Sequence, residues 1–230
     1  MTGIEAAMTS RKQAQDLEAQ RDALIEAALP HVPFDGWTMT ALERGAVDQG
    51  LTSEDALRLF PGTALDMIDR MNRIADSRML EAWDALDRTG MRTPERITTL
   101  VMLRFDWALP HREAVRRGLS QLALPMHAPA GARMLYRTVD AIWKAAGDRS
   151  TDYNFYTKRG LLAAVLASTL LYWLDDHSAD RVETKAFLER RLKDVTFLPQ
   201  LTGRMKALAD RLPSPARLIR ARRMNAPFRG

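Results

Sequence analysis

The sequence contains no cysteine, which excludes disulfide bonds, thiol nucleophiles and cysteine-based zinc sites. It also lacks the HExxH, Walker, GxGxxG and GxSxG patterns. No two of its four histidines lie at metal-ligand spacing on a helix, and it has no Glu-x-x-His pair of the kind that di-iron bundles use. These absences predict a protein that is not an enzyme and that binds no metal or catalytic cofactor.

Long apolar runs and targeting signals are missing as well. The first residues do not follow the basic-then-apolar layout of a signal peptide. The longest uncharged stretch covers residues 160–174, and its 15 residues fall short of the roughly 20 that a bilayer span requires. We therefore interpret it as a buried core helix and expect a cytoplasmic protein that is peripheral to the inner membrane.

The 230 residues are 46% hydrophobic and 27% charged, which is typical of a globular protein. The formal charge of +5 hides an asymmetry, because residues 1–90 carry a net −7 and residues 91–230 a net +12. Residues 211–230 contain six arginines and no acidic residue. Such a basic tail favours binding to phosphate groups, either of lipid or of nucleic acid.

Hydrophobic residues recur at helical spacing throughout, and no segment shows the alternation of a strand. The predicted helices cover residues 9–29, 38–50, 52–60, 63–87, 94–108, 111–124, 132–146, 150–174, 180–195 and 198–212. Short helices with a turn between the second and third precede longer ones. This order predicts an all-α, TetR-like helical bundle with a vestigial N-terminal helix-turn-helix. We divide it into residues 1–90, a lipid-binding bundle over 91–196 and a basic amphipathic segment over 197–230.

The candidate recognition helix argues against DNA binding. It begins Ser53-Glu54-Asp55, and these carboxylates would face a polyanion. Arg58 is the only basic residue in this helix. We therefore expect no nucleic-acid partner, and a TetR-type transcriptional regulator that responds to a hydrophobic ligand stays the alternative function.

The start of the helix after Gly147 combines aromatic rings with charges. Asp152, Phe155, Tyr156 and Arg159 fall on one side of a helical wheel. Exposed aromatic residues beside arginine and aspartate are typical of a protein-binding hot spot, so we predict that these four bind a partner. Alternatively, the rings cover the core beneath neighbouring loops.

Five stretches carry a family resemblance. They are GDRSTDYNFYTKRGLLAAV (147–165), ALPHVPFDGWT (28–38), LFPGT (59–63), LYWLDDHSAD (171–180) and FLERRL (187–192). Together they resemble the Coq-nine family of accessory proteins in ubiquinone biosynthesis. The resemblance implies a TetR-like, non-enzymatic, lipid-binding protein. Such a protein presents quinone precursors to a membrane-associated hydroxylase, typically the di-iron demethoxyubiquinone hydroxylase.

Two positions depart from the family pattern. Phe155 stands where the family has tryptophan, so the indole N–H donor is lost. Pro213 and Pro215 interrupt the region where the family carries an amphipathic membrane helix. The remaining helix over 198–212 is interpreted as an interfacial helix, with a final bundle helix as the alternative. The predicted membrane-binding residues are Leu201, Arg204, Met205, Leu208, Arg217, Arg220, Arg222 and Arg223.

The resemblance also implies an apolar cavity for an isoprenoid quinone or a phospholipid. We expect large apolar side chains of the long helices to line it, although each could equally be ordinary core packing. The predicted lipid-binding residues are Met71, Met79, Trp83, Met102, Phe105, Leu135, Val139, Trp143 and Leu162. The expected partners are the ubiquinone-pathway hydroxylase, a membrane surface with anionic lipid and a second copy of the chain. A lipid carrier without a hydroxylase partner is a further alternative.

Overall fold

The structure is a computed structural model, and it describes the backbone of residues 2–148 and 153–209 and the side chains of residues 12–148 and 156–195. Every regular element in the described backbone is a helix, which confirms the predicted all-α class. The chain forms two compact units, residues 1–188 and residues 189–230. The first unit therefore contains both the N-terminal helices and the bundle that the sequence division had separated.

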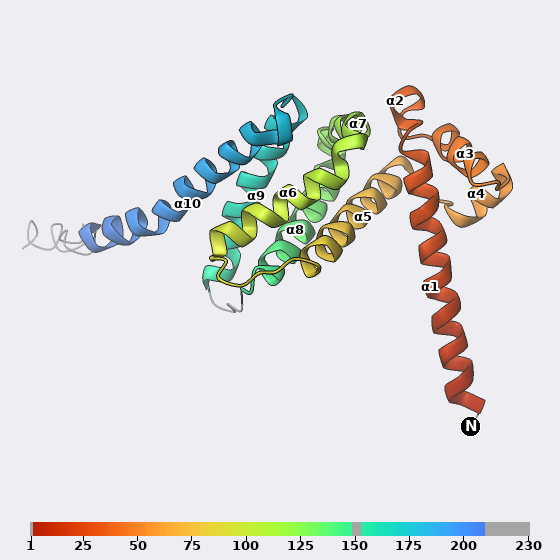
Figure 1. The fold of residues 1–230 in the computed structure, drawn as a ribbon, viewed down its shortest axis with the longest axis horizontal. Coiled ribbons are helices and arrows are strands. Elements are labelled where there is room, and N and C mark those ends of the chain that lie inside the picture. Colours follow the sequence, from red (N-terminus) through yellow and green to blue (C-terminus); the bar gives the residue numbers. More distant parts are fainter. Residues whose placement is uncertain (1, 149–152, 210–230) are drawn as a thin grey trace, which may run out of the picture. The chain divides into compact units, whose positions relative to one another are not determined.

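Four helices open the first unit (Figure 1). They are α1 (Thr2–Ala28), α2 (Val32–Asp35), α3 (Met39–Asp48) and α4 (Ser53–Leu59). A capping box begins α4, because Thr52 Oγ1 accepts from the amide of Asp55 while the Asp55 carboxylate accepts from the amide of Thr52. Gly45 lets α3 approach α1 closely, since a Cβ atom there would lie 2.6 Å from the amide nitrogen of Ala28.

Five further helices follow and pack side by side (Figure 1). They are α5 (Ala64–Asp84), α6 (Thr93–Ala108), α7 (Arg112–Leu122), α8 (Ala128–Ala145) and α9 (Tyr153–Leu174). Helix α5 packs against α6 and α8, and α8 packs against α9. At the centre of the core, the rings of Phe105 and Trp173 stack with centroids 5.1 Å apart, and both side chains are fully buried. The bundle is thus held by large apolar side chains, as the helical spacing predicts.

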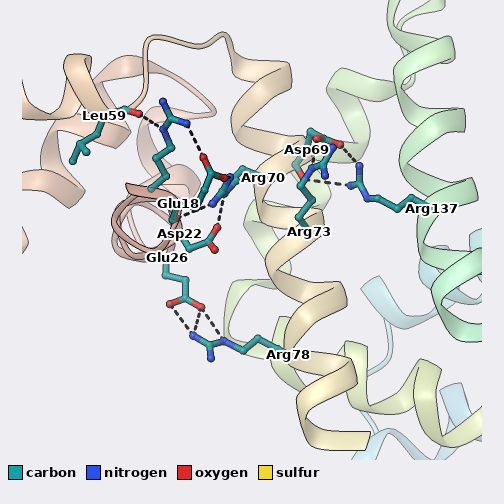
Figure 2. Close-up of polar contacts among 10 residues, drawn as sticks. Glu18, Asp22, Glu26, Leu59, Asp69, Arg70, Arg73, Arg78 and Arg137 are labelled. Atoms are coloured by element: carbon teal, nitrogen blue, oxygen red, sulfur yellow. Dashed lines mark hydrogen bonds and ion pairs between the residues drawn. The ribbon is translucent and has the colours of Figure 1, made fainter. Parts of the chain in front are cut away.

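Ion pairs fasten α1 to α5, as Figure 2 shows. Arg70 of α5 pairs with Glu18 and Asp22 of α1, and it also donates to the Glu18 carbonyl oxygen at 2.7 Å. Further along the same two helices, Arg78 pairs with Glu26 at 3.0 Å. A single exposed ion pair contributes about 0–1 kcal/mol, but a connected set adds both stability and orientation. These contacts fix the N-terminal helices against the bundle.

Several helix boundaries differ from the sequence prediction, and α1 begins at Thr2 where residue 9 was predicted. Pro125–Gly131 was expected to be a loop, but a 3₁₀ helix (Pro125–His127) leads directly into α8. Pro129 lies in the first turn of α8, where a missing N–H costs no helical hydrogen bond. Helix α10 (Val182–Ala209) is continuous where two helices were predicted. Helix α2 lies between the predicted helices 9–29 and 38–50, and Pro33 lies in its first turn.

Candidate functional site

An apolar pocket lies between helices of the bundle. Its volume is about 340 Å³, near the lower end of the range of about 300–1,000 Å³ for small-molecule sites. It is lined from α7, α8 and α9, with one residue each from α5 and α6. The apolar side chains that shape it include Leu119, Leu122, Met134, Leu166, Leu170 and Leu171. This composition suits an apolar ligand better than a charged one.

Part of the buried wall of the pocket is polar. Buried Arg104 of α6 donates from Nε to the Asp76 carboxylate at 2.9 Å and from Nη2 to Asn72 Oδ1 at 2.8 Å. The hydroxyl of Thr138 donates to the same carboxylate at 2.9 Å. Arg137 Nε lies 3.8 Å from the other Asp76 oxygen. Because the Asp76 carboxylate is paired with Arg104 and accepts from Thr138, the negative charge at this wall is balanced.

Of the nine predicted lipid-binding residues, the structure places Leu135 on this pocket. The others do not line it. Their side chains fill the core or lie half-buried, because large apolar residues at helical spacing pack against neighbouring helices first. Buried in the core are Met71, Met79, Trp83, Phe105, Val139 and Leu162, and half-buried are Met102 and Trp143. The lipid-binding role of these eight residues therefore has no support from this pocket.

Sequence reasoning missed Arg104, Asn72 and Thr138. A signal was available for Arg104, which follows Ile97 by seven positions and Val101 by three. Residues at this spacing share one helical face, so the spacing alone places Arg104 near the buried face of α6. The sequence could not indicate that Asp76 of another helix would neutralise it.

The predicted partner-binding residues do not share one environment. The Tyr156 side chain is 71% exposed, whereas Arg159 is only 2% exposed. Arg159 donates to Asp140 at 2.8 Å and to Asp148 at 3.3 Å, so its expected position on an exposed patch is wrong. Charge pairing with two aspartates lets the guanidinium be buried. Asp152 and the side chain of Phe155 lie outside the described residues.

These contacts also determine the pKa of the Asp140 carboxyl. Burial raises the pKa of the Asp140 carboxyl, but hydrogen bonds from Lys144 and Arg159 lower it to below its usual value overall. The carboxylate is therefore charged at neutral pH and pairs with Arg159.

The helix-turn-helix region presents little positive charge. Helices α3 and α4 contain one arginine each, and both pair with aspartate. Arg44 lies 3.1 Å from Asp35, and Arg58 lies 2.5 Å from Asp55, the residue that also caps α4. A surface of this kind is poorly suited to phosphate, and the absence of a nucleic-acid partner stays a prediction.

The predicted membrane-binding residues lie in the second unit. Helix α10 includes four of them, and the structure describes their backbone but not their side chains. They are Leu201, Arg204, Met205 and Leu208. Arg217, Arg220, Arg222 and Arg223 lie outside the described residues altogether. Among the described helices, none combines the length and apolar character that crossing a bilayer requires. The described side chains also contain no group of histidine and acidic residues placed to hold a metal ion.

Comparison with known proteins finds similar proteins that are named COQ9. Residues 128–198 match the COQ9 family model. The chain is 30% identical over 213 residues to the mitochondrial ubiquinone biosynthesis protein COQ9 of Rattus norvegicus, covering 88% of this chain and 68% of that protein. It is 31% identical over 211 residues to the protein of the same name from Homo sapiens, covering 87% and 66%. The chain thus spans about two thirds of the length of these relatives.

Among solved structures, the chain is similar to a TetR transcriptional regulator from Nitrosomonas europaea. The TM-score is 0.63 at 23% sequence identity, over 78% of this chain and 99% of that one. This similarity confirms the TetR-like fold.

Proposed function

This chain belongs to the COQ9 family, and on that premise we propose that it acts in ubiquinone biosynthesis as a non-enzymatic protein that binds an isoprenoid quinone intermediate. The observation that carries the proposal is the apolar pocket lined mainly from α7, α8 and α9. Burial of prenyl surface in such a pocket contributes about 25 cal/mol per Å² without any catalytic group. The curated relatives carry the name of the pathway, which supports the same assignment.

A binding role suits the chemistry of the pocket better than catalysis does. A general base needs a group free to accept a proton from substrate. Asp76 instead accepts from Arg104 and Thr138, and its negative charge is balanced by Arg104. The polar groups at the pocket thus favour holding a ligand over reacting with it.

The quinone intermediate is then presented to a membrane-associated hydroxylase of the pathway. Tyr156 supports this step, because a ring with 71% of its surface exposed at the start of α9 is a ready contact for another protein. The arginines in residues 211–230 would hold the protein at anionic lipid, where the quinone resides. The pairing of two copies stays a prediction.

Mass spectrometry of an organic extract of the purified chain tests the binding proposal. We expect a prenylated quinone or quinone precursor from the wild type and little from Leu170→Trp, which fills the pocket. Leu124→Trp is the matched control, because Leu124 is exposed and does not line the pocket. Phospholipid alone would contradict the quinone assignment. Extracts without lipid, from protein shown to be folded, would contradict lipid binding itself.

A further inference from the structure

The deeply buried part of the pocket lining includes a polar patch. At the outer side of the pocket, Leu171 is 62% exposed. Arg104 and Thr138 are 7% and 2% exposed, about as buried as the apolar lining residues Met134 and Leu166 at 6% and 3%. A purely apolar slot would have hydrocarbon alone at this depth. The polar patch therefore favours a ligand whose polar end enters first.

Arg104 retains one donor group for such a ligand. Its Nε and Nη2 atoms are used by Asp76 and Asn72. Within the described residues, Nη1 makes no hydrogen bond, and it is not among the fully enclosed polar atoms that lack a partner. Arg104 lines the pocket, and Nη1 is the guanidinium nitrogen of Arg104 whose two N–H groups are both unused in the described part of the chain.

The neighbouring polar groups are already occupied. The Asn72 side-chain amide donates to the Ile68 carbonyl oxygen at 2.9 Å, and its oxygen accepts from Arg104. The hydroxyl of Thr138 bonds to Asp76. Since Asp76 balances the charge of Arg104, a carboxylate or phosphate would enter without a free counter-charge and would lose its hydration. A neutral oxygen, such as a quinone carbonyl, carries no such cost.

The volume of the pocket limits how much of a ligand can enter it. A space of about 340 Å³ accommodates a ring with its substituents, so only one end of a long prenylated quinone can occupy it. We propose that the oxygenated ring enters first and accepts a hydrogen bond from Arg104 Nη1, while the prenyl chain leaves past Leu122 and Leu171. This orientation rests on the proposed function. It implies that the ring is shielded in this conformation and must move outward before a hydroxylase can reach it.

Two probes with the same decyl chain test the orientation. Decylubiquinone carries ring oxygens, and decylbenzene carries none. One hydrogen bond from a charged donor predicts that the wild type prefers decylubiquinone by about tenfold or more in Kd. Arg104→Lys keeps a positive charge beside Asp76 but removes the Nη1 donor, so we expect this preference to fall to near unity while the decylbenzene Kd is unchanged.

The control is Arg73→Lys, the same change at an exposed arginine of α5 outside the pocket, which should keep the preference. Binding of both probes without preference in the wild type, or a preference that survives Arg104→Lys, would overturn the orientation but leave lipid binding intact. Binding of neither probe would overturn the proposed function and the orientation together.

A second measurement on the wild type covers the case in which Arg104→Lys does not fold. Decylubiquinone analogues carry a photoreactive group either on the ring or at the chain end, and the crosslinked peptides are identified by mass spectrometry. Crosslinks from the ring-labelled analogue should lie near Met134 and Arg104. Crosslinks from the analogue labelled at the chain end should lie near Leu122 and Leu171. The reversed pattern would overturn the proposal.

Discussion

Replacing Arg159 with alanine should destabilise the protein strongly, although its position beside Tyr156 in the sequence suggests a partner contact. The side chain is 2% exposed, and it donates to Asp140 and Asp148. Removing it leaves two partly buried carboxylates without this cation. The loss of one partner from a buried pair costs about 3–5 kcal/mol. Tyr156 differs, because most exposed residues change stability by less than about 0.5 kcal/mol when substituted.

In a chain of this size, about 1 kcal/mol corresponds to about 2–4 °C in Tm. Arg159→Ala should therefore lower the Tm by about 6–20 °C, and Tyr156→Ala should leave it nearly unchanged. The folded-state pKa of Asp140 is lowered, so the stability that this carboxylate contributes is present above about pH 4 and is lost as the pH falls below it. The deficit of Arg159→Ala should shrink accordingly in acid.

Thermal and urea unfolding followed by circular dichroism measures both variants, and a pull-down with the hydroxylase measures binding. Lys144→Ala is the control, because Lys144 also pairs with Asp140 but its side chain is 69% exposed. Tyr156→Ala should reduce the pull-down at unchanged Tm. A loss below about 1 kcal/mol for Arg159→Ala, or a large Tm drop for Tyr156→Ala, would refute the assignment of one residue to the interior and the other to the docking surface.

Three further results are expected. A gel shift with random duplex DNA at low salt should show no tight, salt-sensitive binding that depends on residues 1–60, because Arg44 and Arg58 are paired with aspartates. Burial raises the pKa of Asp176, but hydrogen bonds from Ser178 and Thr184 outweigh this and lower it overall, so its contribution to stability is present above about pH 4 and lost as the pH falls. Asp176→Asn should therefore cost about 1–2 kcal/mol in urea unfolding at pH 7 and less at pH 3, and an equal cost at both would contradict this. Deletion of residues 211–230 should reduce sedimentation with anionic liposomes, and unchanged sedimentation would remove the tail from the membrane role.

Much of the fold follows from local signals. The capping residues Thr52 and Thr63 begin α4 and α5 as predicted, and Ile68, Met71 and Ala75 form part of the buried stripe of α5. These features depend on neighbours three or four positions away, which a sequence displays directly. Prolines were harder to interpret. Pro33 and Pro129 lie inside first turns, where proline is tolerated, and not after helix ends.

The candidate site was less predictable, because it depends on contacts between helices. Helical spacing identifies which residues face inward but not which of them border a gap in the packing. Met79 and Val139 therefore looked as suitable for a ligand as Leu135, although only Leu135 of these three lines the pocket. Arg159 was misplaced for the same reason, since Asp140 lies nineteen residues away and on another helix.

The two buried arginines differ in their expected roles, one in stability and the other in ligand binding. Arg104 and Arg159 both lie in helices that are otherwise rich in apolar residues, and both pair with aspartate of another helix. Of the two, only Arg104 lines the apolar pocket, and its Nη1 makes no hydrogen bond within the described residues. Arginine-to-lysine exchange should therefore act differently at the two sites. At Arg159 it should lower stability without changing the preference between quinone and hydrocarbon ligands, because that side chain does not line the pocket. At Arg104 it should change this preference, because the planar guanidinium group, which lysine lacks, is the group that would recognise the quinone ring.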